Sequence, residues 1–142
     1  MKLKNINITQ LLKKYAIRPT KGLGQNFLID DSALKKIVAA ADVSSNDVVL
    51  EIGPGLGSLT RYLAAAAKSV VAVEIDKALL GPFAEVVKPF GNIKIINRDI
   101  LKVDLAELFG VKNYLVVANI PYYITSALLR HLLESKSNPS RI

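Results

Sequence analysis

Residues 48–60 read VVLEIGPGLGSLT, and this stretch decides the fold. Its first half is a short, nearly continuous apolar run, which predicts a strand buried on both faces, as in a parallel sheet. Its second half carries glycines at 53, 55 and 57 and leads into a predicted helix over 57–67. Such a turn lets a ligand approach the backbone, because no Cβ intervenes, and the helix start offers free N–H groups.

The pattern of buried strand followed by helix repeats along the rest of the chain. Further strands are predicted over 69–75, 92–99 and 114–120, and further helices over 77–89, 105–109 and 126–135. Pro82 is expected in the first turn of its helix or at a kink. This alternation predicts an α/β fold, with an incomplete doubly wound parallel sheet of about four strands and helices on both faces.

The part of the chain that precedes this sheet is predicted to be helical and basic. Asn7 can cap one short helix, and Asp31 can cap a second. Between them, KGLGQNF at 21–27 has no periodicity and is predicted to be a loop. We therefore divide the chain into residues 1–47, a basic helical segment, and residues 48–142, the sheet domain.

The last residues, SNPSRI at 137–142, are also predicted to be a loop. A loop at this position would leave one edge of the sheet uncovered, and proteins usually protect such edges. The expectation that follows is a fragment of a longer protein.

Composition and charge restrict the possible functions. The chain has 142 residues, of which 51% are hydrophobic, so one domain with a substantial core is expected. It has no cysteine, which excludes a disulfide framework and a thiolate metal site and fits a cytoplasmic protein. No apolar run reaches the roughly 18 residues of a membrane span, and the first residues lack the apolar region of a signal peptide.

The positive charge is concentrated at the N-terminus. The net charge is +7, and residues 1–24 contain six Lys or Arg side chains and no acid. A segment of one sign favours a polyanion such as RNA or DNA, although a solvated surface would explain the same residues.

Two acidic residues fall at the carboxyl ends of predicted strands, where open parallel sheets bind ligands. Glu74 can accept hydrogen bonds from both hydroxyls of a ribose, and Asp99 can accept one from the amino group of adenine. The dinucleotide fingerprint fails, because Ser58 or Thr60 stands where its third glycine belongs. The remaining pattern, an acid and then G-x-G-x-G, resembles the loop of S-adenosylmethionine-dependent methyltransferases. A tight turn with two solvated strand ends is the structural alternative.

The fourth predicted strand ends in the residues NIPYY, at 119–123. The amine of adenine is a poor nucleophile, and acceptors that hold its N–H groups turn its lone pair toward a methyl donor. The Asn119 side-chain oxygen and the carbonyl region of Ile120 or Pro121 are suitable acceptors. Tyr122 can stack on the base, which must be unpaired or flipped to enter such a pocket. An ordinary Asn-x-Pro turn with a buried tyrosine also fits.

Five motifs in order resemble those of the ribosomal RNA adenine dimethyltransferases, most closely the bacterial small-subunit (16S) enzymes associated with kasugamycin sensitivity. They are GLGQNFLID (22–30), VVLEIGPGLGSLT (48–60), VVAVEID (70–76), RDILKVDL (98–105) and VANIPYYIT (117–125). The resemblance implies a Rossmann-like class I methyltransferase fold with S-adenosyl-L-methionine as cofactor. It also implies dimethylation of two adjacent adenines in small-subunit ribosomal RNA, with the pre-30S subunit as partner.

The resemblance implies roles for individual residues on the cofactor side. Asn26 and Leu28 would line the amino-acid end of the cofactor, within a loop that covers the site. Gly53 would contact the cofactor through its backbone. Glu74 would hold the ribose, and Asp99, together with the residue after it, would hold the adenine.

On the target side, the resemblance implies that Asn119 serves both the cofactor pocket and the reacting amine. Pro121 and Tyr122 would lie beside it as the other catalytic residues. Arg98 is a departure, because the family often has a small residue there, and it should hardly affect cofactor binding. The single histidine, His131, is expected at or near the surface without a catalytic role, and no metal site is expected.

Other interpretations stay open. Large-subunit RNA methyltransferases of the erythromycin-resistance type share the pocket motifs, and a non-catalytic RNA-binding assembly factor could keep the same fold. A nicotinamide-dependent dehydrogenase is disfavoured by the missing glycine. The family has further strands and a C-terminal helical domain. Because this chain ends before those segments, it is predicted to bind cofactor weakly and to methylate RNA inefficiently. It is expected to be monomeric.

Overall fold

The computed structural model describes residues 3–19, 27 and 30–142. Its centre is a parallel sheet made of β1 (Val48–Ile52), β2 (Ser69–Glu74), β3 (Ile93–Asn97) and β4 (Leu115–Ala118). The strands lie in the order β3-β2-β1-β4, so the chain starts centrally, builds outward and then returns to the other side of β1. The predicted α/β fold with a four-stranded parallel sheet is confirmed. The reversal of direction beside β1 is the position at which such sheets bind ligands.

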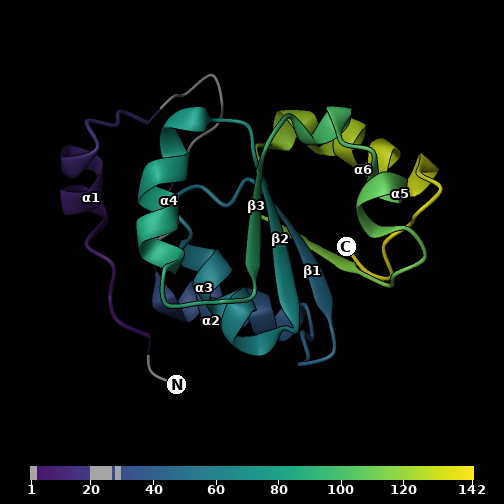
Figure 1. Cartoon of the computed structure of the whole chain (residues 1–142), viewed down its shortest axis with the longest axis horizontal. Coiled ribbons are helices and arrows are strands. Elements are labelled where there is room, and N and C mark those ends of the chain that lie inside the picture. The colour runs from purple at the N-terminus through teal and green to yellow at the C-terminus, as the bar shows by residue number, and fades with distance from the viewer. Residues whose placement is uncertain (1–2, 20–26, 28–29) are drawn as a thin grey trace.

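Helices cover both faces of this sheet (Figure 1). One face carries α2 (Asp31–Ala40), α3 (Ser58–Ala66) and α4 (Leu80–Val87), and the other carries α5 (Leu105–Phe109) and α6 (Thr125–Glu134). Three connections begin with short 3-10 helices, η2 (Lys77–Leu79), η3 (Ile100–Lys102) and η4 (Tyr122–Ile124). Pro82 is the third residue of α4 and so lies in its first turn, as predicted.

The sheet separates two apolar layers, which explains why its strands are apolar at nearly every position. Leu50 of β1 packs in the layer that contains Leu128 of α6. Its neighbour Val49 packs in the opposite layer with Leu63 of α3. Both strand residues are fully buried, because successive side chains point to opposite faces and each face is covered.

The N-terminal helix α1 (Ile8–Lys14) joins the same core. Its Leu11 is buried in a cluster with Leu56 and Leu79, which follow β1 and β2 respectively. Asn7 caps α1 as predicted, because its side chain accepts a hydrogen bond from the Gln10 amide at 3.0 Å. The basic segment therefore packs on the sheet domain, and the division of the chain at residue 47 stays a prediction.

The start of α2 differs from the prediction by one residue. Asp30, and not Asp31, is the N-cap, and its carboxylate accepts from the Ser32 amide at 2.8 Å and the Ala33 amide at 3.4 Å. Asp31 is the first helical residue, where its negative charge meets the positive end of the helix dipole. Two adjacent aspartates are chemically equivalent caps, so the sequence alone does not distinguish them.

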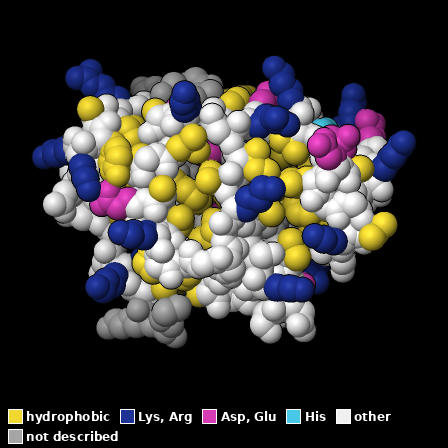
Figure 2. All heavy atoms as spheres, in the orientation of Figure 1, with side chains coloured by type: hydrophobic (Ala, Val, Ile, Leu, Met, Phe, Trp, Pro, Cys, Tyr) yellow, Lys and Arg dark blue, Asp and Glu magenta, His cyan; other side chains and the backbone are white. Residues whose placement is uncertain are grey.

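The surface carries many basic side chains. Figure 2 shows Lys and Arg side chains spread across one face of the molecule, with hydrophobic side chains between them. Among the described residues, ion pairs join Lys14 to Glu85 at 2.8 Å and Arg141 to Asp47 at 3.5 Å. Within the residues that the structure describes, no helix is long and apolar enough to cross a bilayer.

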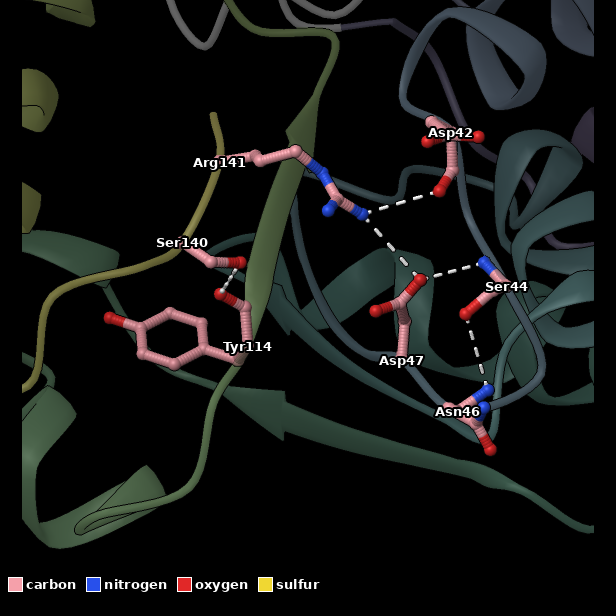
Figure 3. A network of polar contacts seen from close by, with 7 residues as sticks. All are labelled: Asp42, Ser44, Asn46, Asp47, Tyr114, Ser140 and Arg141. Atoms are coloured by element: carbon pink, nitrogen blue, oxygen red, sulfur yellow. Dashed lines mark hydrogen bonds and ion pairs between the residues drawn. The ribbon is translucent and has the colours of Figure 1, made fainter.

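The prediction of a loop over the whole of 137–142 is wrong at its end. The Ser140 amide donates to the Tyr114 carbonyl at 2.8 Å, and the Val116 amide donates to the Arg141 carbonyl at 2.9 Å. Arg141 therefore pairs with β4 in parallel register, opposite Leu115. Figure 3 shows the Arg141 guanidinium reaching the carbonyl oxygen of Asp42 and the carboxylate of Asp47. Backbone pairing and this ion pair override the turn-forming Asn-Pro sequence just before.

Candidate cofactor and target site

A cavity of about 350 Å³ lies at the carboxyl ends of all the strands. Its walls come from the glycine turn after β1, the end of β2, the turn after β3 and the NIPYY segment after β4. The predicted site residues that line it are Gly53, Glu74, Asp99, Asn119 and Pro121. The structure therefore brings together residues that are up to 68 positions apart in the chain, counted from residue 53 to residue 121.

The glycine turn has the shape that glycine alone adopts easily. Gly55 has φ +59° and Gly57 has φ +84°, both in the left-handed region. A Cβ on Gly55 would lie 3.3 Å from the Phe27 ring, and one on Gly57 would lie 3.2 Å from Phe83. The turn is thus fixed both by its backbone conformation and by close packing. The side of the turn that no side chain covers forms part of the cavity wall.

Glu74 ties the end of β2 to this turn. Its carboxylate accepts from the Gly55 amide at 3.0 Å and from the Asp76 amide at 2.9 Å, and it is only 5% exposed. Burial raises the pKa of Glu74, while the two amide hydrogen bonds oppose that rise. The carboxylate is held in one orientation at the cavity wall, which suits a group that binds a fixed ligand.

Glu51 is a site residue that sequence reasoning did not assign. It lies in β1, two residues before Gly53, is 2% exposed and lines the cavity. The Thr60 hydroxyl donates to its carboxylate at 2.5 Å. Burial raises the pKa of Glu51 to about 8, the Thr60 hydrogen bond opposes this, and the nearby Glu74 adds to it. The signal in the sequence is an acidic residue inside an otherwise apolar strand. Burying a carboxyl group costs free energy unless a partner or a ligand compensates for it, so such a residue indicates a site.

Asp99 forms the third acidic wall. Its carboxylate accepts from the Leu101 amide at 3.0 Å and so caps η3. Ile75 and Leu101, which follow Glu74 and Asp99 closely, also line the cavity although they are 52% and 38% exposed. Arg98 lines the cavity as well. Two exposed aliphatic side chains beside two carboxylates suit a ligand with a flat apolar ring and polar edges.

The NIPYY segment forms the opposite wall. Asn119, Pro121 and Tyr123 line the cavity, whereas Tyr122 does not and is 91% exposed beside it. The two tyrosine rings meet edge to face, with centroids 6.4 Å apart and an interplanar angle of 79°. Sequence reasoning selected Tyr122 for the base and did not assign Tyr123 to the wall. Neither tyrosine is buried, so the alternative of a buried turn tyrosine does not hold here.

Three other predicted residues have different outcomes. Asn26 and Leu28 lie outside the described residues, but Phe27 between them lines the cavity. The His131 Nε2–H donates to the Val103 carbonyl oxygen at 2.9 Å, and the ring is half-buried and does not line the cavity. Within the described part of the chain, no group of His, Cys, Asp and Glu side chains is arranged to hold a metal ion.

The charges of the cavity favour a cationic ligand. Among the residues that the structure describes, three acids, Glu51, Glu74 and Asp99, line it, against one cation, Arg98. A pyrophosphate would be repelled by this set, whereas a sulfonium or ammonium group would be attracted. Burial raises the pKa of both Glu51 and Glu74, and a cation beside them would favour their charged forms.

Solved structures place this fold in the class of Rossmann-like S-adenosylmethionine-dependent methyltransferases. The 23S rRNA methyltransferase ErmE is 35% identical with a TM-score of 0.71, over 80% of this chain and 45% of its own. A dimethyladenosine transferase from Plasmodium falciparum is 31% identical with a TM-score of 0.68, over 80% of this chain and 40% of its own. The predicted fold class is therefore confirmed.

Within that class, the chain belongs to the ribosomal RNA adenine dimethylase family, whose model matches residues 18–142. The ribosomal RNA small subunit methyltransferase A of Leuconostoc mesenteroides is 47% identical over 133 residues, which are 90% of this chain and 45% of that protein. The protein of the same name from Lysinibacillus sphaericus is 43% identical over 136 residues, 92% of this chain and 46% of its own length. The chain spans about half the length of the curated relatives it matches.

Proposed function

We propose that this chain binds S-adenosyl-L-methionine in the cavity and forms the cofactor-binding part of an enzyme that dimethylates adenine amines in small-subunit ribosomal RNA. The observation that carries the proposal is the convergence of the glycine turn, three carboxylates and Asn119 on one cavity. A nicotinamide dinucleotide would bring a pyrophosphate to these acids and is therefore disfavoured. The family membership supports the same assignment.

The residues present fit each part of the cofactor. Glu74 would accept hydrogen bonds from the ribose hydroxyls, and Asp99 would accept one from the adenine amine. Ile75 and Leu101 would pack on the faces of the adenine, which explains their exposure in the free chain. The Gly53 backbone would lie against the amino-acid end, close to Glu51.

When bound, the cofactor supplies a methyl group on a sulfonium, from which a neutral thioether leaves. The chain's own residues have to align the acceptor for in-line attack. The Asn119 side-chain oxygen and the carbonyl of Ile120 or Pro121 would accept hydrogen bonds from the adenine amine. The methylated amine would pass its proton to solvent, so the chain would not have to supply a strong base.

Tyr122 would stack on the target base at the mouth of the cavity. Its ring is exposed and free to meet a flat ligand, and base stacking on an aromatic side chain contributes about 1–3 kcal/mol. A paired base has no exposed face, so the substrate has to present the adenine in a loop or in flipped form.

Small-subunit ribosomal RNA is the substrate that the names of the curated relatives favour. A ribosome precursor in the cytoplasm is the form of that RNA that we propose as the partner. Large-subunit RNA is the second candidate, because ErmE, named for 23S rRNA, has a similar structure. The distinction can be tested by offering both precursor RNAs in excess of the chain and locating methylated adenines by primer extension.

Cofactor binding can be tested directly by isothermal titration of S-adenosyl-L-methionine into the chain. Asp99→Asn should weaken binding about tenfold, because a hydrogen bond to a charged acceptor contributes about 1.5–3 kcal/mol. Asp104→Asn is the matched control, since Asp104 likewise caps a helix, α5, but does not line the cavity. Binding of NAD in place of the methyl donor, or equal losses in both variants, would contradict the proposal.

A further inference from the structure

The outer side of α1 carries a shallow groove that the cavity chemistry does not use. It is lined by residues at the end of the helix and in the turn that follows: Thr9, Leu12, Lys13, Ala16, Ile17 and Arg18. From residue 3 to residue 19 the chain has Lys4, Lys13, Lys14 and Arg18 and no acid. The groove thus has an apolar floor with basic side chains on its rim.

The cations of this segment differ in whether the fold neutralises them. Lys14 is paired with Glu85 at 2.8 Å, and the Tyr15 hydroxyl donates to the same carboxylate at 2.6 Å. Lys13 and Arg18 have no ion pair with any residue that the structure describes. The two side chains that rim the groove are therefore available to pair with an external anion.

The turn that brings these two cations together is strained. Ala16 has φ +51°, a left-handed conformation that normally takes glycine. The Ile17 amide donates to the Leu12 carbonyl at 2.9 Å and the Ala16 amide to the Lys13 carbonyl at 3.1 Å, which is the Schellman pattern of a helix end. The turn reverses the chain, so Arg18 returns to the same groove as Lys13. Strain of about 1 kcal/mol at a non-glycine position is often kept where geometry matters.

The groove is one side-chain layer away from the cavity. Leu12 and Ile17 pack in the same apolar cluster as Phe27, Leu56 and Leu79. The last three side chains also line the cavity, so α1 is fixed to its wall. Figure 2 shows Lys and Arg side chains at the left margin, where α1 lies in Figure 1. An RNA strand that presents a base to the cavity would have its phosphate backbone within reach of the α1 groove.

We propose that the α1 groove, through Lys13 and Arg18, binds the phosphate backbone of unpaired RNA next to the base held at the cavity. This inference rests on the proposed function for the identity of RNA as partner. The apolar floor would contact sugars, and the two cations would each neutralise one phosphate. Thr9 offers a hydroxyl for a further hydrogen bond.

The test is fluorescence anisotropy of a labelled, unpaired 12-nucleotide RNA, titrated with the full chain at several salt concentrations. For Lys13→Gln/Arg18→Gln, the slope of log K against log salt should fall by about 1.4, that is about 0.7 for each phosphate on a single strand. Affinity at 100 mM salt should fall about 10- to 30-fold.

Lys68→Gln/Lys112→Gln is the matched control. It removes the same charge from two exposed lysines at the opposite end of the sheet from the cavity. Lys68 directly precedes β2, and Lys112 lies shortly before β4. Its slope should stay close to that of the parent chain. Equal falls in the two double variants, or no change in the α1 variant, would overturn the proposal. Both variants should keep the melting temperature of the parent, because all four side chains are exposed.

A parallel titration with S-adenosyl-L-methionine separates this inference from the proposed function. The α1 variant should bind the methyl donor as the parent does, since neither Lys13 nor Arg18 lines the cavity. Failure of the parent chain to bind the methyl donor would contradict the proposed function while leaving the RNA slopes as an independent result.

Discussion

The two sides of the cavity are built in opposite ways. On the β1–β2 side, Glu51 and Glu74 are buried, and each is held by a hydrogen bond to a nearby residue. On the β4 side, Asn119, Tyr122 and Tyr123 are exposed, and the two aromatic rings contact each other at the mouth. The first side is preorganised for a small ligand of fixed shape. The second is open, as is required for a large substrate that inserts one base.

This comparison predicts that the two sides fail differently when mutated. The largest effect is expected for Asn119→Ala, which removes the acceptor that would orient the reacting amine. Single-turnover methyl transfer, with the chain in excess over RNA, should fall about 100- to 1000-fold, as for loss of one hydrogen-bonding group aligned with the transition state.

Asn119 also lines the cofactor cavity, so the affinity for S-adenosyl-L-methionine has to be measured beside the rate. A change in affinity of only a few fold with the large loss of rate would place Asn119 on the target side. Equal losses in rate and affinity would show instead that the two sides are one unit.

The next largest effect is expected for Glu74→Gln. The amide of glutamine replaces one carboxylate oxygen with a donor, which would face the donating amide of Gly55 or Asp76. Calorimetric affinity for the methyl donor should fall about 10- to 100-fold, because charged hydrogen bonds contribute about 1.5–3 kcal/mol. Glu107→Gln, on the exposed surface of α5, is the control and should bind normally.

The sequence predicts the preorganised side better than the open one, and the reason is physical. A buried strand, a glycine turn and an acid at a strand end are local patterns, so Gly53, Glu74 and Asp99 could be selected from spacing and the family resemblance. Glu51 was not assigned, because its role depends on which face of β1 meets the cavity and on Thr60 in the following helix.

Tertiary contacts also decide the features that sequence reasoning placed incorrectly or left out. Arg141 pairs with β4 because Asp47 and the carbonyl of Asp42 hold its side chain, residues almost one hundred positions away. Which tyrosine of NIPYY faces the cavity depends on the direction of η4, and adjacent identical residues give no signal for it.

A smaller effect is expected for Tyr122 on the open side. Tyr122→Leu should weaken binding of an RNA with an unpaired adenine about 5- to 100-fold, because stacking on one base contributes about 1–3 kcal/mol. Tyr122→Phe keeps the ring and should bind nearly as the parent does. A probe with 2-aminopurine in place of the adenine reports stacking directly by its fluorescence. If the phenylalanine variant lost as much affinity as the leucine variant, the hydroxyl and not the ring would be responsible.

The smallest effect is expected in stability, and it tests whether the buried side is built for a cation. The pKa of Glu51 is raised to about 8 from 4.5, so between these values the folded state binds a proton that the unfolded state has released. The contribution of Glu51 to the free energy of unfolding is fully present below its unfolded pKa of 4.5. It decreases above that pH and is lost as the pH rises through about 8.

The free energy of unfolding of the parent chain should therefore fall by about 1–2 kcal/mol more than that of Glu51→Gln between pH 6 and pH 8. Urea denaturation at several pH values measures this difference. The raised pKa of Glu74 acts in the same direction in both proteins and so largely cancels. Saturating S-adenosyl-L-methionine should reduce the difference, because a cation beside Glu51 lowers its pKa. Parallel pH profiles for the two proteins would mean that Glu51 is ionised in the free fold, and the buried side would then hold its charges without a ligand.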